Sequence, residues 1–313
     1  LDSFEKAINS NTILLIGSAP NYPTGMMDPV ESLSKLAVNH GLLFHVDACI
    51  GGFLLAYLKK IGNDIPLFDF KLSGVTSLSV DLHKYAYAPK GSSVLLYRNE
   101  ELRKEQFSVY PNWEGGIYGS TTFLGTKPGG IVASTWMALN HIGQDGYVKL
   151  TYKTMYATKV IREYIQNSKD LSLIGNPIMS LLAFNSEKHD IYHIADLLSE
   201  KGWYIGRLQN PPGIHLVVSQ IHADGAAKEL VEDMEEIVEK INTSTIKNKL
   251  SKVGDNLSVN AVKSLGYKSL KKAVVASTGS KNSKKRLIYD LKSSLDLDQS
   301  NDLFKSILNR FYQ

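Results

Sequence analysis

Two residues in the first third of the chain have the types and the spacing for covalent cofactor chemistry. Asp47 ends the apolar run 42–47, and Lys84 follows 37 residues later, directly after His83. A lysine amine can hold an aldehyde cofactor as a Schiff base, and a carboxylate against a ring nitrogen keeps that nitrogen protonated, so that the ring accepts electrons from a carbanion. Pyridoxal phosphate needs both groups. The pair therefore predicts a pyridoxal phosphate site.

Each of these residues also has a simpler interpretation. A single aspartate after a strand is usually a helix cap, and a His-Lys pair is usually a solvated surface feature. The small residues that follow Asp47, among them Gly51 and Gly52, could merely allow a helix to pack closely. The combination of aspartate, glycine pair and His-Lys in this order is much more specific than any one of its parts.

Short apolar runs that alternate with helical patterns are expected to position these residues. Strands are predicted at 12–17, 42–47, 77–80 and 94–97, and helices at 30–40 and 53–60. This alternation is typical of an α/β architecture with parallel strands, in which chemistry collects at the carboxyl ends of the strands. Asp47 lies at such an end, and Lys84 lies just beyond another.

The pattern changes near residue 145 and predicts a separate α+β unit. We expect helices at 146–167, 191–201 and 225–242, and strands at 171–174, 179–184 and 214–218. The chain should thus divide into part of a large domain at 1–145, a smaller C-terminal domain at 146–243 and an extension at 244–313. The extension is basic, since residues 241–313 hold 14 Lys+Arg and 5 Asp+Glu, and we expect it to be helical or partly disordered.

Two motifs carry a resemblance to a known family. The segments 45–53 (HVDACIGGF) and 81–93 (DLHKYAYAPKGSS) resemble the sphingosine-1-phosphate lyases, within the group II decarboxylase superfamily. Shorter matches follow at 113–120, 127–130, 141–147 and 201–203, so that the resemblance covers about residues 12–240. It implies an aspartate-aminotransferase-like large domain of fold type I. That domain should be partial, because the family's main phosphate-binding loop lies upstream of the position that corresponds to Leu1.

The resemblance also implies roles for the residues around the cofactor. Lys84 would hold pyridoxal phosphate, Asp47 would bind the ring nitrogen, His83 would lie beside the phosphate and Ala48 would pack near the ring. The loop that contains Gly129 is similar to the family segment that reaches the cofactor phosphate of the neighbouring subunit. A homodimer with shared active sites is therefore expected.

On the substrate side, the resemblance implies that Tyr118 and Lys90 lie near the active site and affect activity. Tyr22 is a weaker candidate of the same kind. Without the resemblance, Tyr118 could be a packed aromatic in a glycine-rich loop and Lys90 an ordinary turn residue. One departure from the family is Lys127, which stands where the family usually has arginine. Lysine lacks the planar, bidentate fork of arginine.

The activity implied by the resemblance is a retro-aldol cleavage of phosphorylated sphingoid bases to a long-chain aldehyde and phosphoethanolamine. An amino-acid decarboxylase of the same superfamily is the alternative enzyme, and it would share Asp47 and Lys84 but not the segments 87–91 and 115–118. An inactive fragment or interaction protein is a third interpretation. Cofactor binding by the chain would distinguish this last interpretation from the two enzymes.

The composition limits the compartment and the partners that are expected for the protein. The single cysteine, Cys49, excludes an internal disulfide and indicates a reducing compartment, with a cytoplasmic location as the default. No run of about 20 apolar residues is present. His189 and His193 have a helical metal-ligand spacing but no third ligand, so no metal site is predicted. The basic extension predicts either peripheral contact with an anionic membrane or a soluble extension, and nucleic-acid binding is not predicted.

Overall fold

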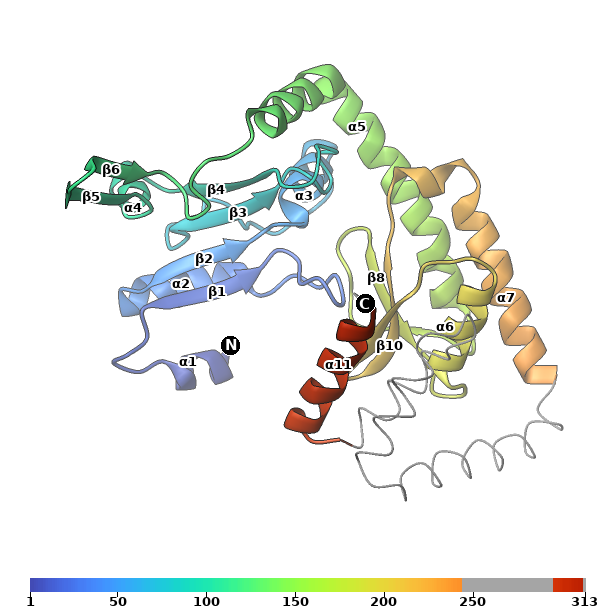
Figure 1. Cartoon of the computed structure of the whole chain (residues 1–313). Helices are drawn as coiled ribbons and strands as arrows, with labels where there is room; N and C mark the ends of the chain where they lie inside the picture. Colours follow the sequence, from blue (N-terminus) through green and yellow to red (C-terminus); the bar gives the residue numbers. More distant parts are fainter. Residues whose placement is uncertain (244–294, 312–313) are drawn as a thin grey trace. The chain divides into compact units, whose positions relative to one another are not determined.

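The computed structural model describes residues 1–243 and 295–311, and these residues form two compact units (Figure 1). The first unit comprises residues 1–162, 173–183 and 216–227. The second comprises residues 163–172, 184–215 and the described residues from 228 onward. The first unit contains all the residues that are predicted to bind the cofactor, namely Asp47, Ala48, His83, Lys84 and Gly129.

A four-stranded sheet is the centre of the first unit, with strand order β1-β2-β3-β4. Its strands are β1 (Leu14–Ser18), β2 (Leu43–Asp47), β3 (Ser77–Asp81) and β4 (Ser93–Tyr97). The first three strands are parallel, because α2 (Val30–His40) and α3 (Gly51–Lys60) lie between them along the chain and return it to the same edge. No helix separates β3 from β4, and these two strands pair antiparallel.

One face of this sheet is buried and the other is open. Alternate residues of the strands, such as Phe44, Val46 and Leu78, join a hydrophobic core with the apolar sides of α2 and α3. The residues between them point to the opposite face. On that face Ile16 of β1 and Leu95 of β4 are about half exposed, so the two helices cover only one side of the sheet.

The glycine pair after Asp47 serves the packing of α3. A Cβ atom on Gly51 would lie 2.0 Å from the carbonyl oxygen of Ala19, and one on Gly52 would lie 2.7 Å from a methyl carbon of Val80. Any larger side chain would push α3 away from the sheet. The simpler interpretation of these two glycines is therefore confirmed, and the chemical interpretation depends on Asp47 and its other neighbours.

The rest of the first unit includes short helices, a hairpin and the start of a long helix. The helices are α1 (Asp2–Ala7) and α4 (Glu100–Lys104), and β5 (Ser108–Trp113) pairs with β6 (Gly116–Ser120) in an antiparallel hairpin. Helix α5 (Gly129–Asn167) is interrupted at Gly143, whose φ of 60° and ψ of 177° are not helical. The domain boundary expected at 145 lies near this break, but the first compact unit continues to residue 162.

A second four-stranded sheet has the order β7-β8-β10-β9, formed by β7 (Ser172–Leu173), β8 (Leu181–Asn185), β9 (Gly206–Gln209) and β10 (Pro212–Val217). The later helical elements are α6 (Ile191–Glu200), the short 3-10 helix η1 (Gln220–Asp224), α7 (Ala226–Thr243) and α11 (Leu297–Phe311). Most of the expected extension, 244–294, lies outside the described residues. None of the described helices has the length and apolar composition of a membrane span.

Candidate active site

Parallel pairing of β2 and β3 brings the two predicted cofactor residues to the same edge of the sheet. Asp47 is the last residue of β2 and Asp81 the last residue of β3. Lys84 follows in the turn 82–86, where its backbone N–H donates to the carbonyl oxygen of Asp81 at 3.2 Å. The turn places the Lys84 side chain over the edge at which Asp47 ends.

The amine of Lys84 has two partners among the described residues. Its Nζ donates to the Sγ of Cys49 at 3.0 Å and lies 2.9 Å from Oδ2 of Asp81. The backbone N–H of Cys49 in turn donates to Oδ1 of Asp47 at 3.0 Å, so that Cys49 connects the lysine to the first carboxylate. Burial lowers the pKa of Lys84, but the contacts with Cys49 and Asp81 outweigh burial and raise this pKa above its ordinary value.

The carboxylate of Asp47 is held in its ionised form. Burial raises its pKa, but hydrogen bonds from the backbone of Cys49 and from the hydroxyl of Ser79, which donates to Oδ1 at 3.0 Å, outweigh burial. The pKa of Asp47 is therefore below its ordinary value. A carboxylate that stays charged at neutral pH can hold a proton on an aromatic ring nitrogen.

His83 is fixed beside Lys84 by a backbone contact. Its Nδ1 lies 2.7 Å from the carbonyl oxygen of Ser92. Because a carbonyl oxygen only accepts, Nδ1 carries the proton and donates it. The other ring nitrogen, Nε2, lies 3.7 Å from Oδ2 of Asp81. His83 thus presents Nε2 at the same edge of the sheet as the amine of Lys84.

Sequence reasoning missed several residues of this cluster. His45 lies on the face of β2 that carries Asp47, and its two ring nitrogens are 2.8 Å and 3.3 Å from the hydroxyls of Ser77 and Ser79. Cys49 and Asp81 contact the lysine directly. The alternation of polar residues along 77–81, next to the polar alternation of 45–47, was a signal that these side chains share one face.

The other predicted site residues lie on several elements. Ala48 is fully buried beneath the sheet edge. Tyr118 is half exposed on β6, Tyr22 is 56% exposed in the segment after β1, and Lys90 is exposed in the turn before β4. Gly129 is the first residue of α5. The described hydrogen bonds thus unite Asp47 and Lys84 through Cys49. The expected roles of all the site residues, these two included, remain predictions.

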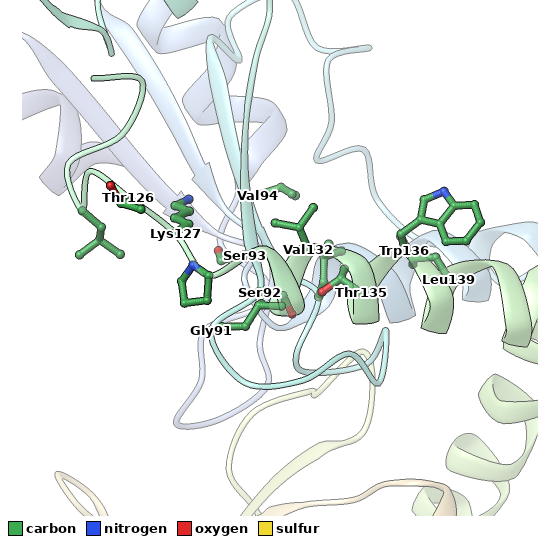
Figure 2. A pocket seen from close by; sticks show the side chains of 14 residues that line it. Gly91, Ser92, Ser93, Val94, Thr126, Lys127, Val132, Thr135, Trp136 and Leu139 are labelled. Carbon is green, nitrogen blue, oxygen red and sulfur yellow. The ribbon is translucent and has the colours of Figure 1, made fainter. Parts of the chain in front are cut away.

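An apolar pocket lies beside the lysine turn in the same unit (Figure 2). It has a volume of about 570 Å³ and is lined by residues of the turn and β4 and by the segment 124–139. The hydroxyl of Thr135, a residue only 8% exposed, is buried in the wall and has no hydrogen-bond partner among the described residues. Trp136 lines the same pocket and is 67% exposed.

The chemistry of the sheet edge fits pyridoxal phosphate. The partly exposed amine of Lys84 can be reached by an aldehyde, and the ionised carboxylate of Asp47 can hold a ring nitrogen. Cys49 links the two groups through contacts of 3.0 Å on each side, which keeps both at one site. A covalent anchor and a ring partner are the two functions that the cofactor requires of the protein.

Comparison with known proteins agrees with this assignment. The chain is 44% identical over 237 residues to a sphingosine-1-phosphate lyase of Arabidopsis thaliana and 44% identical over 225 residues to one of Saccharomyces cerevisiae. These alignments cover 76% and 71% of this chain, but only 43% and 38% of the relatives. The chain therefore spans less than half the length of these curated relatives.

Solved structures confirm the fold class. A sphingosine-1-phosphate lyase of Burkholderia pseudomallei aligns with a TM-score of 0.75 and 36% identity, over 81% of this chain and 58% of that one. A glutamate decarboxylase of Lactobacillus brevis has a TM-score of 0.65 at 20% identity, over 76% of this chain and 57% of that one, which is a likeness of fold alone. The structure thus contains part of the large domain of a fold type I pyridoxal phosphate enzyme.

The profile of one protein family matches the segment that holds the whole lysine cluster. This family is described as the pyridoxal-dependent decarboxylase conserved domain, and the match covers residues 16–187, more than half of the chain. The match includes the last three residues of β1, the strands β2 to β4, the turn of Lys84 and the whole of α5. The chain belongs to the pyridoxal-dependent decarboxylase family.

Proposed function

We propose that the protein is a pyridoxal-phosphate-dependent lyase that cleaves phosphorylated sphingoid bases to a long-chain aldehyde and phosphoethanolamine. The observation that supports this most is the cluster of Lys84, Cys49 and Asp47. It lies in a chain that is 40–44% identical to sphingosine-1-phosphate lyases of plants, animals, yeast and Dictyostelium. The amino-acid decarboxylase alternative is supported by the family match and by the fold, but the glutamate decarboxylase structure is only 20% identical to this chain.

The cofactor, when bound, would accept the electron pair released as the bond between C2 and C3 of the substrate breaks. Lys84 would hold the cofactor covalently and give up its place to the amine of the substrate. Asp47, ionised and fixed by two hydrogen bonds, would keep the proton on the ring nitrogen. Nε2 of His83, which lies at the same edge of the sheet, would lie toward the cofactor phosphate.

Cleavage also requires a base that takes the proton of the C3 hydroxyl and an acid that returns a proton to C2. Once the substrate amine has displaced it, the partly exposed amine of Lys84, whose pKa is above its ordinary value, is suited to return the proton to C2. Tyr118, Lys90 and Tyr22 are proposed to act on the substrate side. All three are accessible to solvent in this chain, which suits residues that meet an incoming ligand.

We also propose a homodimer with shared sites, formed through the hairpin and the start of α5. The apolar side chains of this segment are exposed: Ile117 is 83% exposed, Trp113 and Tyr118 about half, and Trp136 67%. Large exposed apolar surfaces of this kind usually mark a protein interface. The partner subunit would cover the pocket of Figure 2 and bring the loop of Gly129 to the neighbouring cofactor phosphate.

A cytoplasmic location with peripheral membrane contact fits the proposed substrate. The free thiol of Cys49, which lies next to the lysine, fits a reducing compartment. Phosphorylated sphingoid bases reside in membranes, so the enzyme would work at a membrane surface. Flotation of the protein with anionic and with neutral vesicles tests this membrane contact. We expect the protein to bind the anionic vesicles only.

The cofactor assignment is tested by trapping. The purified protein is incubated with pyridoxal phosphate, reduced with borohydride and digested, and the modified peptide is identified by mass spectrometry. We expect the label on Lys84, and we expect Lys84→Ala to lose both the label and the visible absorbance of the bound cofactor. Lys153→Ala, which removes an exposed lysine paired with Asp224, is the control and should retain both. A label on another lysine would refute the assignment.

The reaction is tested separately on the full-length protein. Phosphorylated sphingosine is supplied in mixed micelles, and the release of long-chain aldehyde and phosphoethanolamine is followed by mass spectrometry. Equal amounts of the two products are expected, with none from Lys84→Ala. Release of carbon dioxide from amino acids, without cleavage of the sphingoid base, would instead support the decarboxylase.

A further inference from the structure

Asp81 is the second partner of the cofactor lysine, and neither the cofactor nor the substrate chemistry described above uses it. Its Oδ2 lies 2.9 Å from Nζ of Lys84 and 3.7 Å from Nε2 of His83. The side chain of Asp81 is only 17% exposed, and that of Lys84 is 30% exposed. An ion pair at this depth is screened less by solvent than a surface pair, so its geometry can influence the lysine.

Asp81 is itself held by two neighbouring segments. Its Oδ1 accepts a hydrogen bond from the hydroxyl of Ser93 at 2.6 Å, across the antiparallel pair of β3 and β4 in which these two residues are partners. Its backbone N–H donates to the carbonyl oxygen of Cys49 at 3.0 Å. One carboxylate oxygen is thus fixed to β4, and the other is presented to Lys84.

We propose that Asp81 is the positioning residue for Lys84, and that its carboxylate, oriented by Ser93, holds the amine whenever this amine is not bound to the cofactor. This state exists before the cofactor is loaded, and again when the amine of a substrate has displaced the lysine. The inference rests on the proposed role of Lys84 as the cofactor lysine. The contact between the two side chains is present in the chain without cofactor.

The physical reason is the freedom of the lysine side chain. A free lysine has a flexible four-carbon stem and a strongly hydrated ammonium, and would leave a half-buried site for solvent. The charge of Asp81 offsets the cost of keeping the ammonium at the sheet edge, and Cys49 supplies a second contact. The same charge favours the protonated amine, since an opposite charge within hydrogen-bond distance raises the pKa of a lysine.

Among the described residues, four titratable groups face or neighbour the amine: Cys49 and Asp47 from the end of β2, Asp81 from β3, and His83 from the turn. Of these, Asp81 is the carboxylate in direct contact with Nζ. Asp81 is also ionised, because its hydrogen bonds with Ser93 and Lys84 outweigh burial and lower its pKa. Neutralising it should therefore release a larger fraction of uncharged, mobile amine.

The test measures the reactivity of Lys84 in the protein without cofactor. Trace acetic anhydride is added between pH 7 and pH 10, and acetylation of each lysine is quantified by peptide mass spectrometry. Asp81→Asn keeps the shape and removes the charge. We expect Lys84 to react about tenfold faster at pH 8 in this variant, with its profile shifted by about one pH unit to lower pH. Asp81→Glu should restore most of the wild-type profile.

Two further variants separate positioning from general damage to the fold. Ser93→Ala leaves the charge of Asp81 but releases its orientation, and should raise the reactivity of Lys84 by about two- to threefold. Asp224→Asn removes a comparable carboxylate from an exposed pair with Lys153, 3.1 Å away, and should leave Lys84 unchanged. Circular dichroism confirms the fold of each variant, and Ser93→Ala decides the question if Asp81→Asn does not fold.

The inference is overturned if the profile of Lys84 is the same in wild type and in the folded Asp81 or Ser93 variant, or if Asp224→Asn changes it equally. Its failure can be told from failure of the proposed function, because acetylation needs no cofactor. If borohydride trapping labels another lysine while Asp81→Asn still shifts Lys84, the pairing exists but serves no cofactor, and the positioning role is also rejected.

Discussion

Replacing Asp47 with asparagine removes one charge from the site while keeping its shape. The amide oxygen of the variant can still accept hydrogen bonds from the backbone of Cys49 and from Ser79, both 3.0 Å from Oδ1 in the wild type. The fold should therefore survive. The variant loses the ionised carboxylate that would hold the proton on the ring nitrogen, so we expect it to bind the cofactor and to turn over substrate poorly.

The effect on stability follows from the two hydrogen bonds. Bonds to a charged group contribute about 1.5–3 kcal/mol each and neutral ones about 0.5–1.5 kcal/mol, so the two together would lose about 2–3 kcal/mol. The cost of burying the charge of Asp47 offsets part of the stability that these hydrogen bonds contribute, and solvent at the partly exposed side chain weakens the bonds further. We expect Asp47→Asn to lower the free energy of unfolding by about 1 kcal/mol at pH 7.

The contribution of Asp47 to the free energy of unfolding depends on pH. The pKa of Asp47 in the folded chain is below its ordinary value of 3.8. Its stabilising contribution is therefore complete above the pKa of the unfolded state and is lost as the pH falls through the folded pKa. The difference in unfolding free energy between wild type and Asp47→Asn should be present at pH 7 and pH 5 and should disappear well below pH 4.

Urea unfolding at a series of pH values, followed by tryptophan fluorescence, measures this difference. Cofactor capture by the same samples is read from visible absorbance. A variant as stable as the wild type at pH 7, or a difference that does not change down to pH 3, would refute the electrostatic account of Asp47. Full activity in the variant would refute its role at the ring nitrogen.

Two further predictions concern the scaffold of the site. Gly51→Ala should lower the free energy of unfolding by about 1–3 kcal/mol, because the new Cβ would lie 2.0 Å from the carbonyl oxygen of Ala19; an unchanged urea midpoint would contradict the close packing of α3. Tyr85→Phe should lower the free energy of unfolding by about 1–3 kcal/mol. The buried hydroxyl of Tyr85 lies 2.5 Å from Oγ of Ser180 and donates to the carbonyl oxygen of Val218 at 2.8 Å, and the variant loses both contacts. Thermal unfolding measures this loss, and an unchanged midpoint would mean that the hydroxyl contributes no net stability.

Much of the first unit could be predicted from local patterns. The helix at 30–40 has the predicted bounds, and the four strands around 12–17, 42–47, 77–80 and 94–97 differ from the observed ones by no more than two residues at each end. These elements have strong apolar periodicity, and their pairing follows from the connections between them. A helical connection gives parallel strands, whereas the short turn after Lys84 gives the antiparallel β4.

Other features have no comparable local signal. The hairpin of β5 and β6 was not predicted, because neither face of its strands is buried among the described residues and no apolar alternation marks it. The first half of α5 was not predicted either, since its apolar residues, such as Trp136, point largely to solvent. A periodic pattern predicts an element only when one of its faces packs against a core.

The sequence by itself was enough to predict the cofactor of this protein, from a lysine and an aspartate at a spacing typical of pyridoxal phosphate enzymes. The motif around Asp47 is shared by many such enzymes, whereas the motif that follows Lys84 is more specific. The residue type limits which side chain can form a covalent bond or hold a proton, and the residue types of a motif are visible in the sequence. Only the tertiary structure decided which neighbours control these groups. Cys49 and Asp81 lie 35 and 3 residues from Lys84 along the chain, yet both contact its amine, because strand register and the path of a turn bring them together.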